Sequence, residues 1–226
     1  MNQLSQIGII VYPGSNCDQD CQRVFQEKFK IKLHRIWHQE ASLPKTIKGL
    51  ILPGGFSYGD YLRSGALASL SHIMPAIREH AKKGGAILGI CNGFQILTES
   101  KLLPGALLTN QSNQFICQDS KLKPCDSHIV WNQSLGKDEI SLPIAHKEGR
   151  YYIDEQGLNN LEEKRQILLR YHDSNPNGST ADIAGVCSED GKIQGMMPHP
   201  ERASLEGYHK ETHGLKVFEN FLAHTL

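Results

Sequence analysis

The sequence lacks the features that mark several large classes of protein. Of its 226 residues, 24 are Lys or Arg and 24 are Asp or Glu, so the formal net charge is zero. Without a basic excess, binding to nucleic acid or to an anionic membrane surface is not indicated. No apolar stretch approaches the length of a membrane span, and the polar start Met1–Gln6 has no signal-peptide profile. We therefore expect a cytoplasmic protein that binds neither nucleic acid nor membrane.

Signatures of bound nucleotides and metals are also missing. No Gly-rich loop ends in Gly-Lys-Ser/Thr and no Gly-x-Gly-x-x-Gly follows an expected strand, so the chain has no nucleotide-binding motif of its own. The six cysteines show no CxxC pair and no repeated metal-ligand spacing: Cys17, Cys21, Cys91, Cys117, Cys125 and Cys187. In a cytoplasmic chain of this size we expect reduced thiols, no metal site and no cofactor.

Apolar runs and helix-like segments alternate through the first part of the chain. Strands are expected at residues 7–11, 31–37, 50–52 and 86–90, and helices at residues 18–30, 66–83 and 92–100. This alternation predicts an α/β fold with an open, mostly parallel sheet flanked by helices. In such sheets, functional sites lie beyond the carboxyl ends of the strands.

The middle of the chain has a different pattern. Between Ala106 and Tyr171, short strand-like runs separated by polar turns predict an antiparallel extension at the edge of the sheet, with runs at residues 106–108, 115–117, 128–131 and 167–171. A hairpin is expected over residues 183–197 and a closing helix over residues 212–223. Because no linker is visible, we expect a single domain spanning residues 1–226.

The first candidate for chemistry is Cys91, in the sequence Gly89-Ile90-Cys91-Asn92-Gly93. The pattern Gly-x-Cys-x-Gly after an apolar strand is that of a nucleophile elbow, with cysteine in the place of serine. Such a turn exposes the thiol at a helix N-terminus, where unpaired N–H groups and the helix dipole favour the thiolate. The backbone N–H of Asn92 is then placed to help bind an oxyanion. An inert core cysteine is the alternative interpretation of this stretch.

The second candidate is His199, which lies between Pro198 and Pro200 and is followed by Glu201. Both prolines favour extended geometry, in which residues i and i+2 point the same way. Glu201 can therefore reach the far nitrogen of the His199 ring and fix its tautomer, as the third member of a catalytic triad does. A proline-rich surface turn with an incidental histidine is the alternative.

The third candidate is the sequence Pro53-Gly54-Gly55, which follows an apolar strand. Glycines at a strand end allow the backbone to present an N–H group with no side chain in the way. If this strand neighbours the strand before Cys91, Gly55 could donate the second hydrogen bond to an oxyanion. A simple loop after a buried strand is the alternative.

With these three motifs together, the chain resembles the class I (triad) glutamine amidotransferases, which have a flavodoxin-like fold. Among them it is similar to the free-standing glutaminase subunits of phosphoribosylformylglycinamidine synthases. The similarity runs nearly end to end and rests on four segments, at residues 13–18, 52–63, 89–95 and 197–202. One departure is visible: the family usually reads Ala-His-Gly-Glu-Gly-Arg where this chain has Lys147 at the first glycine.

The resemblance implies roles for particular residues. Cys91, His199 and Glu201 would form the triad, with Gly54, Gly55 and Asn92 around the oxyanion. Gln95 matches the family position that contacts the substrate, L-glutamine. Four further polar residues are candidates for docking, with solvated loop charge or turn capping as the alternative for each: Asn16, Arg63, Lys147 and Arg150.

The resemblance also implies the reaction and its partners. The chain would hydrolyse glutamine through a cysteine thioester and deliver ammonia to a synthetase subunit, which makes formylglycinamidine ribonucleotide in purine biosynthesis. ATP and Mg²⁺ would bind to that synthetase and not to this chain, and a small third subunit would complete the complex.

Two other kinds of function stay open at the level of sequence. One is another enzyme on the same framework, either a glutaminase subunit for a different synthetase or a γ-glutamyl hydrolase. The other is a non-enzymatic thiol sensor that uses the elbow cysteine. The pairing of His199 with Glu201 argues against a sensor, because a sensor has no need of an oriented base.

Overall fold

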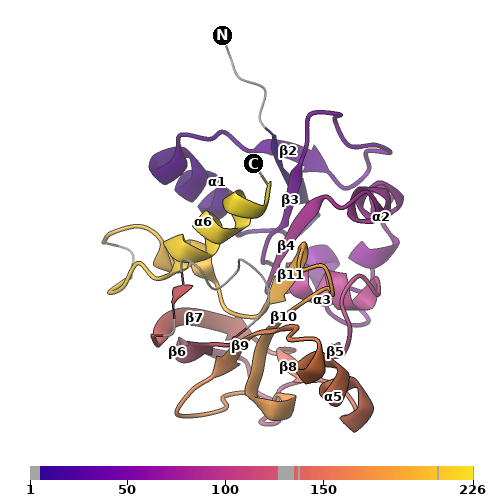
Figure 1. Cartoon of the computed structure of the whole chain (residues 1–226). Coiled ribbons are helices and arrows are strands. Elements are labelled where there is room, and N and C mark those ends of the chain that lie inside the picture. Colours follow the sequence, from indigo (N-terminus) through magenta and orange to yellow (C-terminus); the bar gives the residue numbers. More distant parts are fainter. Residues whose placement is uncertain (1–5, 127–134, 137, 208, 226) are drawn as a thin grey trace.

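The computed structural model describes residues 6–126, 135–136, 138–207 and 209–225. Its main sheet has nine strands in the order β2-β1-β3-β4-β11-β10-β9-β6-β7, and a smaller sheet pairs β5 with β8 (Figure 1). The strands are β1 (Ile7–Val11), β2 (His34–Trp37), β3 (Gly49–Leu52), β4 (Ala86–Ile90), β5 (Ala106–Leu108), β6 (Ile116–Pro124), β7 (Ile140–His146), β8 (Arg150–Tyr152), β9 (Ile167–Tyr171), β10 (Ile183–Cys187) and β11 (Ile193–Met196). The α-helices are α1 (Asp18–Val24), α2 (Met74–Lys82), α3 (Asn92–Glu99), α5 (Glu155–Glu163) and α6 (Gly214–Thr225).

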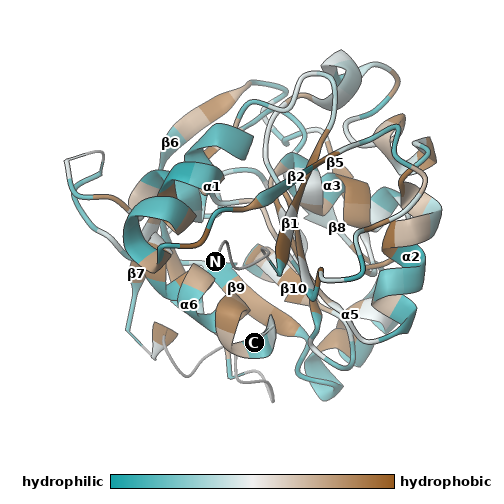
Figure 2. Ribbon diagram, turned by 90° about the horizontal axis from the view of Figure 1, so that it is seen from above, coloured by the Kyte–Doolittle hydropathy of each residue, from teal (hydrophilic) through white to brown (hydrophobic). Residues whose placement is uncertain are grey.

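The first half of the main sheet is parallel, as the alternation of strands and helices predicts. Strands β2, β1, β3, β4 and β11 pair in parallel, and three of them, β1, β3 and β4, are buried at every position. Such strands are covered on both faces. Helices α1 and α6 cover one face and α2 and α3 the other (Figure 1). In the view from above, the apolar strands lie between helices whose outer sides are hydrophilic (Figure 2).

The second half of the sheet is the antiparallel extension. Strands β10, β9, β6 and β7 continue the sheet beyond β11, and each pair is antiparallel. The mostly parallel sheet, the hairpin of β10 and β11, and the closing helix are therefore confirmed. Residues 128–131, expected as a strand, lie outside the described residues.

The sequence pattern misses most of one strand of this extension and all of another. β6 covers Ile116–Pro124, although only residues 115–117 are expected as a strand, because residues 118–121 are polar and mostly exposed. β7 is not predicted at all, since Pro143 interrupts the run. Pro143 is tolerated because β7 is the last strand of the sheet, where one row of backbone groups needs no ladder partner. Helix α5 is a further omission, and its signal is the N-cap Asp154, which accepts from Gly157 N at 2.7 Å.

The predicted helix over residues 66–83 is wrong in its first half. Helix α2 begins only at Met74, and a single 3₁₀ turn, Ala68–Leu70, precedes it. Pro75 lies in the first turn of α2. A proline is tolerated there because the backbone N–H groups of the first turn make no hydrogen bond within the helix. The same proline inside a longer helix would remove a hydrogen bond and clash with the preceding turn. Within the described chain, no helix combines the length and the apolar character needed to cross a membrane.

Gly93 carries the closest contact between α3 and the sheet. A Cβ atom at this position would lie 1.9 Å from the carbonyl oxygen of Leu52 in β3, which is backbone and cannot move aside. We therefore expect Gly93→Ala to lower the free energy of unfolding by about 3 kcal/mol or more, measured by urea denaturation.

The matched control is Gly157→Ala in α5. A Cβ atom there meets only side-chain atoms of Ile153 and Asp154, which can shift, and alanine favours a helix. A similar loss of stability in both variants would contradict the close approach inferred at Gly93.

Candidate active site

Cys91 occupies a sharp turn between β4 and α3. Its backbone has φ 48° and ψ −103°, outside the conformations that L-residues adopt freely. The turn brings strand and helix close together, and glycine at position 89 makes this approach possible. A Cβ at Gly89 would lie 2.5 Å from Leu97 and 2.8 Å from Gly93. The backbone N–H of Cys91 donates to Met196 O at 2.7 Å, which fixes the turn to β11. This geometry is that of a nucleophile elbow.

The other two predicted segments converge on this turn. Strand β4 pairs in parallel with β3 on one side and with β11 on the other. The glycines after β3 and His199 after β11 therefore flank Cys91 at the carboxyl ends of adjacent strands. The condition set by the sequence, that the strand before Gly54 neighbours the strand before Cys91, is met.

His199 and Glu201 form a buried pair. His199 Nδ1 lies 2.6 Å from Glu201 Oε1, and both residues are nearly inaccessible to solvent. Burial by itself lowers the pKa of His199, but the charge of Glu201 and, after it, the Cys91 thiol raise that pKa well above its ordinary value. Because Glu201 holds Nδ1, Nε2 is the nitrogen left to exchange a proton with Cys91; it is buried without a hydrogen-bond partner among the described residues.

The end of β7 forms another wall of the site. The Cys91 thiol lies 3.7 Å from Ala145 O, and the backbone N–H of His199 donates to Pro143 O at 2.8 Å. His146, the next residue of β7, is buried, and this burial lowers its pKa. The charge of the nearby His199 lowers the pKa of His146 further. The antiparallel extension thus supplies part of the site.

The two glycines after β3 are held tightly at the site. A Cβ at Gly54 would lie 2.7 Å from the His199 ring, so only glycine fits against it. Gly55 has φ 140°, which also requires glycine. Ser15 and Gly55 form an isolated antiparallel bridge. In this bridge the backbone N–H of Phe56, and not that of Gly55, donates to Gly14 O at 2.9 Å.

Asn92 and Gln95 lie on the first turn of α3, and both are buried. The Asn92 side chain donates to Gln95 Oε1 at 2.9 Å and accepts from Ser57 N at 3.3 Å. Gln95 Nε2 in turn donates to Glu148 O at 2.6 Å. The backbone N–H of Asn92 is at the start of the helix, where N–H groups have no helical partner. These two side chains therefore brace the helix N-terminus, and a substrate contact by Gln95 stays a prediction.

The four candidate docking residues are all at or near the surface, with different neighbours. Arg63 forms an ion pair with Glu99 at 2.7 Å, and Arg150 Nε donates to Thr109 O at 3.0 Å. Asn16 accepts from the Cys17 thiol at 3.3 Å. Lys147 is exposed and does not adopt the left-handed conformation, so a lysine fits where the family usually has glycine.

Three residues close to the triad carry signals that the sequence did not reveal. His146 has one ring nitrogen, Nδ1, 3.1 Å from Asn110 Oδ1, while Nε2 is buried without a partner among the described residues. Asp60 has a pKa raised to about 6, chiefly by burial and further by Glu148. Cys17, which spacing alone did not distinguish, lies 3.9 Å from His199 Nδ1. These contacts join segments far apart in sequence, so no local pattern announces them.

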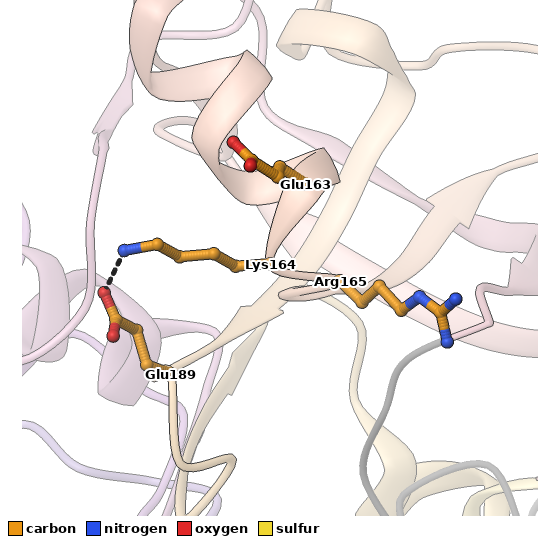
Figure 3. Close-up of a pocket in the computed structure, with 4 residues that line it drawn as sticks. All are labelled: Glu163, Lys164, Arg165 and Glu189. Atoms are coloured by element: carbon orange, nitrogen blue, oxygen red, sulfur yellow. Dashed lines mark hydrogen bonds and ion pairs between the residues drawn. The ribbon is translucent and has the colours of Figure 1, made fainter.

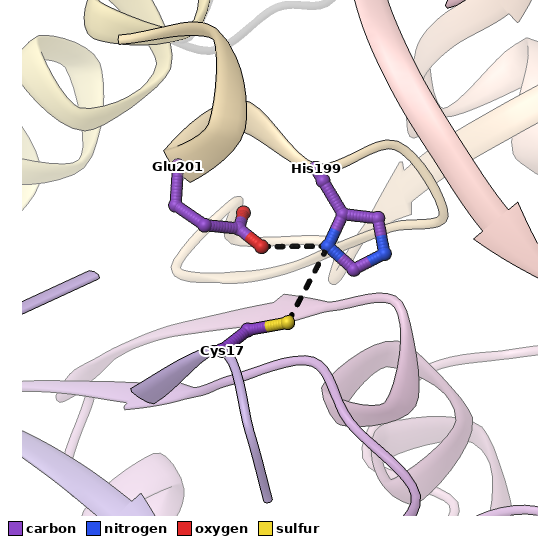
Figure 4. A group of neighbouring side chains, drawn as sticks. All are labelled: Cys17, His199 and Glu201. Carbon is purple, nitrogen blue, oxygen red and sulfur yellow. Dashed lines mark hydrogen bonds and ion pairs between the residues drawn. The ribbon is translucent and has the colours of Figure 1, made fainter. Parts of the chain in front are cut away.

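Among the residues that the structure describes, two groups of side chains have the ligand types of a metal site. One is Cys17 with His199 and Glu201, drawn in Figure 4, and the other is the more exposed group of Glu139, His172 and Asp173. In the first group the carboxylate already holds the imidazole.

A surface pocket of about 350 Å³ lies apart from these residues, between the end of α5 and the turn that joins β10 to β11 (Figure 3). Its lining is charged, and Lys164 and Glu189 are joined by an ion pair across it. Cys91, His199 and Glu201 do not line this pocket.

Comparisons with known proteins agree with the geometry. The family model for CobB/CobQ-like glutamine amidotransferase domains matches residues 5–222. The chain is 48% identical over 221 residues to phosphoribosylformylglycinamidine synthase subunit PurQ of a Nostoc species, covering 96% of each. It is 48% identical over 218 residues to the subunit of the same name from Alkaliphilus metalliredigens, covering 96% of this chain and 95% of the relative.

Solved structures give the same picture. A chain of PurLQS from Thermotoga maritima is 40% identical, with a TM-score of 0.86 over 97% of this chain and 98% of its own. A glutamine amidotransferase from the same organism has only 16% identity and a TM-score of 0.66, and shows the fold alone. Fold and elbow together define a glutamine amidotransferase of the CobB/CobQ-like class. Within that class, the chain belongs to the family of phosphoribosylformylglycinamidine synthase PurQ subunits.

The burial of His146 gives a prediction on stability. Its pKa is lowered to about 4, chiefly by burial and further by the charge of His199, whereas an unfolded histidine titrates near 6.5. The unfolded chain therefore binds an extra proton between these values, so the stability present above about pH 6.5 falls as pH drops toward 4. We expect His146→Gln to remove about 3 kcal/mol of this pH dependence, measured by urea denaturation across the range.

Asp60→Asn is the control, because Asp60 titrates in the opposite sense. Its raised folded pKa makes the native chain lose stability as pH rises from about 4 to 6. The asparagine variant should therefore gain stability relative to the native chain toward neutral pH. Identical pH profiles for His146→Gln and the native chain would contradict the assignment to His146.

Proposed function

We propose that this chain is the glutaminase subunit of phosphoribosylformylglycinamidine synthase. It hydrolyses L-glutamine and passes the ammonia to a synthetase subunit that makes formylglycinamidine ribonucleotide with ATP. The observation that carries the proposal is the elbow at Cys91, flanked by the buried pair of His199 and Glu201, in a chain of the PurQ family. A thiol sensor would have no use for an oriented base.

The reaction begins with proton transfer from the thiol. His199 Nε2 takes the proton of Cys91 Sγ, while Glu201 stabilises the imidazolium that results. The thiolate then adds to the side-chain carbonyl carbon of glutamine and forms a tetrahedral intermediate. As this intermediate collapses, His199 gives its proton to the departing nitrogen, and ammonia leaves from a glutamyl thioester.

The oxyanion of the intermediate needs donors that are in place before the reaction. The N–H groups of Asn92 and Gly55 supply them, with Gly54 keeping the strand end close to the imidazole. Losing one such donor typically slows an enzyme by about 100-fold or more. Water then attacks the thioester, His199 accepts the proton of the water, and the Cys91 thiol is restored as glutamate leaves.

Ammonia is the product that the partner uses. The chain has no nucleotide-binding motif, so the ATP-dependent step belongs to the synthetase, where ATP and Mg²⁺ bind. A small third subunit completes the proposed complex, in keeping with the PurLQS structure that this chain resembles. Purine synthesis places the complex in the cytoplasm.

Labelling by a glutamine-shaped electrophile tests the glutamine site. A diazo-ketone analogue of glutamine should modify Cys91 alone, and excess glutamine should protect it, because the thiolate and the substrate pocket act together. Mass spectrometry locates the adduct, and iodoacetamide serves as the control for general thiol reactivity. Modification by iodoacetamide but not by the analogue, with the synthetase subunit present, would remove the glutamine assignment.

Cys91→Ala should abolish the release of ammonia from glutamine, because no thioester can form. The measurement is glutamate production, with γ-glutamyl dipeptides as alternative substrates to detect a peptide hydrolase. The synthetase assembled with this variant should still use added ammonium, since its own site is intact. Appreciable glutaminase activity in the variant would disprove the role of Cys91.

Coupling to the synthetase sets the rate in our proposal. Because free ammonia would escape, we expect low glutaminase activity for the chain alone and a rise when the synthetase and its nucleotide substrate are added. Steady-state glutamate release with and without the partner measures the effect. A high rate that is independent of the partner would argue for a free-standing hydrolase.

A further inference from the structure

Cys17 has no part in the proposed reaction, yet it is buried directly beside the triad (Figure 4). Its sulfur lies 3.9 Å from His199 Nδ1, the same nitrogen that Glu201 holds. On its other side, Arg202 Nη2 donates to the sulfur at 3.4 Å. We propose that Cys17 is a positioning residue: its sulfur holds the Arg202 guanidinium, so that the neighbouring Glu201 carboxylate serves His199 alone.

The Arg202 guanidinium contacts the Cys17 sulfur and not the neighbouring Glu201 carboxylate, which is unusual. Arg202 follows Glu201 directly in the sequence, and an ion pair would ordinarily form between a guanidinium and a carboxylate so close together. Instead, Glu201 Oε2 is buried without a hydrogen-bond partner among the described residues. The guanidinium makes its bond to a neutral sulfur, a weaker acceptor.

Arg202 also has room to move toward Glu201. A cavity of about 300 Å³ lies beside the pair, and Asp20, Arg23, Glu201, Arg202 and Leu205 line it. Arg202 is only half-buried. The contact with Cys17 therefore holds the guanidinium beside a cavity that reaches Glu201.

Cys17 is well suited to hold that position. Its backbone N–H donates to Gly54 O at 3.3 Å, and its thiol donates to Asn16 Oδ1 at 3.3 Å. The sulfur lone pairs then face Arg202. Burial raises the pKa of this thiol, so it stays neutral and adds no charge to the site. The guanidinium on the sulfur also opposes a metal ion at Cys17, His199 and Glu201.

Whether Glu201 pairs with His199 alone affects the protonation of the His199 ring, which several neighbouring groups influence. Glu201, Cys91 and, through its own contact with the ring, Cys17 favour the imidazolium, whereas the neighbouring His146 opposes it only if charged. Asp20 and Arg202 lie farther out, beside Glu201. An Arg202–Glu201 ion pair would weaken the carboxylate's effect on the ring, and with it the thiolate of Cys91 that the imidazolium stabilises.

The test rests on the role of His199 in the proposed function, but it needs neither glutamine nor the synthetase. The rate at which iodoacetamide alkylates Cys91 is measured against pH, with the adduct quantified by mass spectrometry. In Cys17→Ala we expect the midpoint for thiolate formation to rise by about one pH unit, which makes alkylation below the midpoint about tenfold slower. Cys17→Ser, which keeps an acceptor for Arg202, should retain the native midpoint.

The double variant Cys17→Ala/Arg202→Met separates this role from a structural one. Without the guanidinium, Glu201 again serves His199 alone, so the midpoint should return to its native value. Where Cys17→Ala fails to fold, Cys17→Val fills the space with a somewhat larger apolar side chain and removes the acceptor. An unchanged midpoint in the single variant, or the same rise in single and double variants, would overturn the inference. Neither result bears on glutamine labelling, which tests the proposed function separately.

Discussion

The parallel pairing of three adjacent strands is the constraint on which the site depends. Because β4 lies between β3 and β11, the turn at Cys91 is held on both sides by neighbouring backbones. The hydrogen bond from Cys91 N to Met196 O and the contact of Gly93 with Leu52 O leave little freedom in this turn. The strained conformation of Cys91 persists because the sheet around it determines the turn from both sides. The geometry of the Cys91 turn is thus a property of the sheet and not of a loop.

Burial gives the charged groups of the site their effect. Glu201 and His199 are buried in the protein interior. A charge acts more strongly on its neighbour there than it does at the surface. The same burial has the opposite consequence for His146, whose pKa falls to about 4, so that it stays neutral. The carboxylate of Glu201 therefore favours the protonated form of His199, while the neighbouring His146 stays neutral.

Local motifs predicted the turn at Cys91 and the pairing of His199 with Glu201 because both depend on short-range geometry. The elbow is contained in Gly89–Gly93, and the spacing of His199 and Glu201 is that of an extended segment. The sequence also indicated the parallel sheet, whose strands are continuous apolar runs. The sequence did not predict the features that tertiary contacts determine. β7 tolerates Pro143 only because it is an edge strand, and Cys17 comes close to His199 only in the folded chain. The oxyanion and substrate roles stay predictions.

The loop over residues 57–64 is connected to the helix N-terminus at Asn92. Leu62 in this loop is 87% exposed and has φ 69°, both uncommon for a leucine. From the same loop, Ser57 N donates to Asn92 Oδ1 at 3.3 Å, and Ser64 N donates to Glu148 at 2.9 Å. A shift of this loop therefore acts on Asn92 directly and on Gln95 through Glu148, which accepts from Gln95 Nε2 at 2.6 Å.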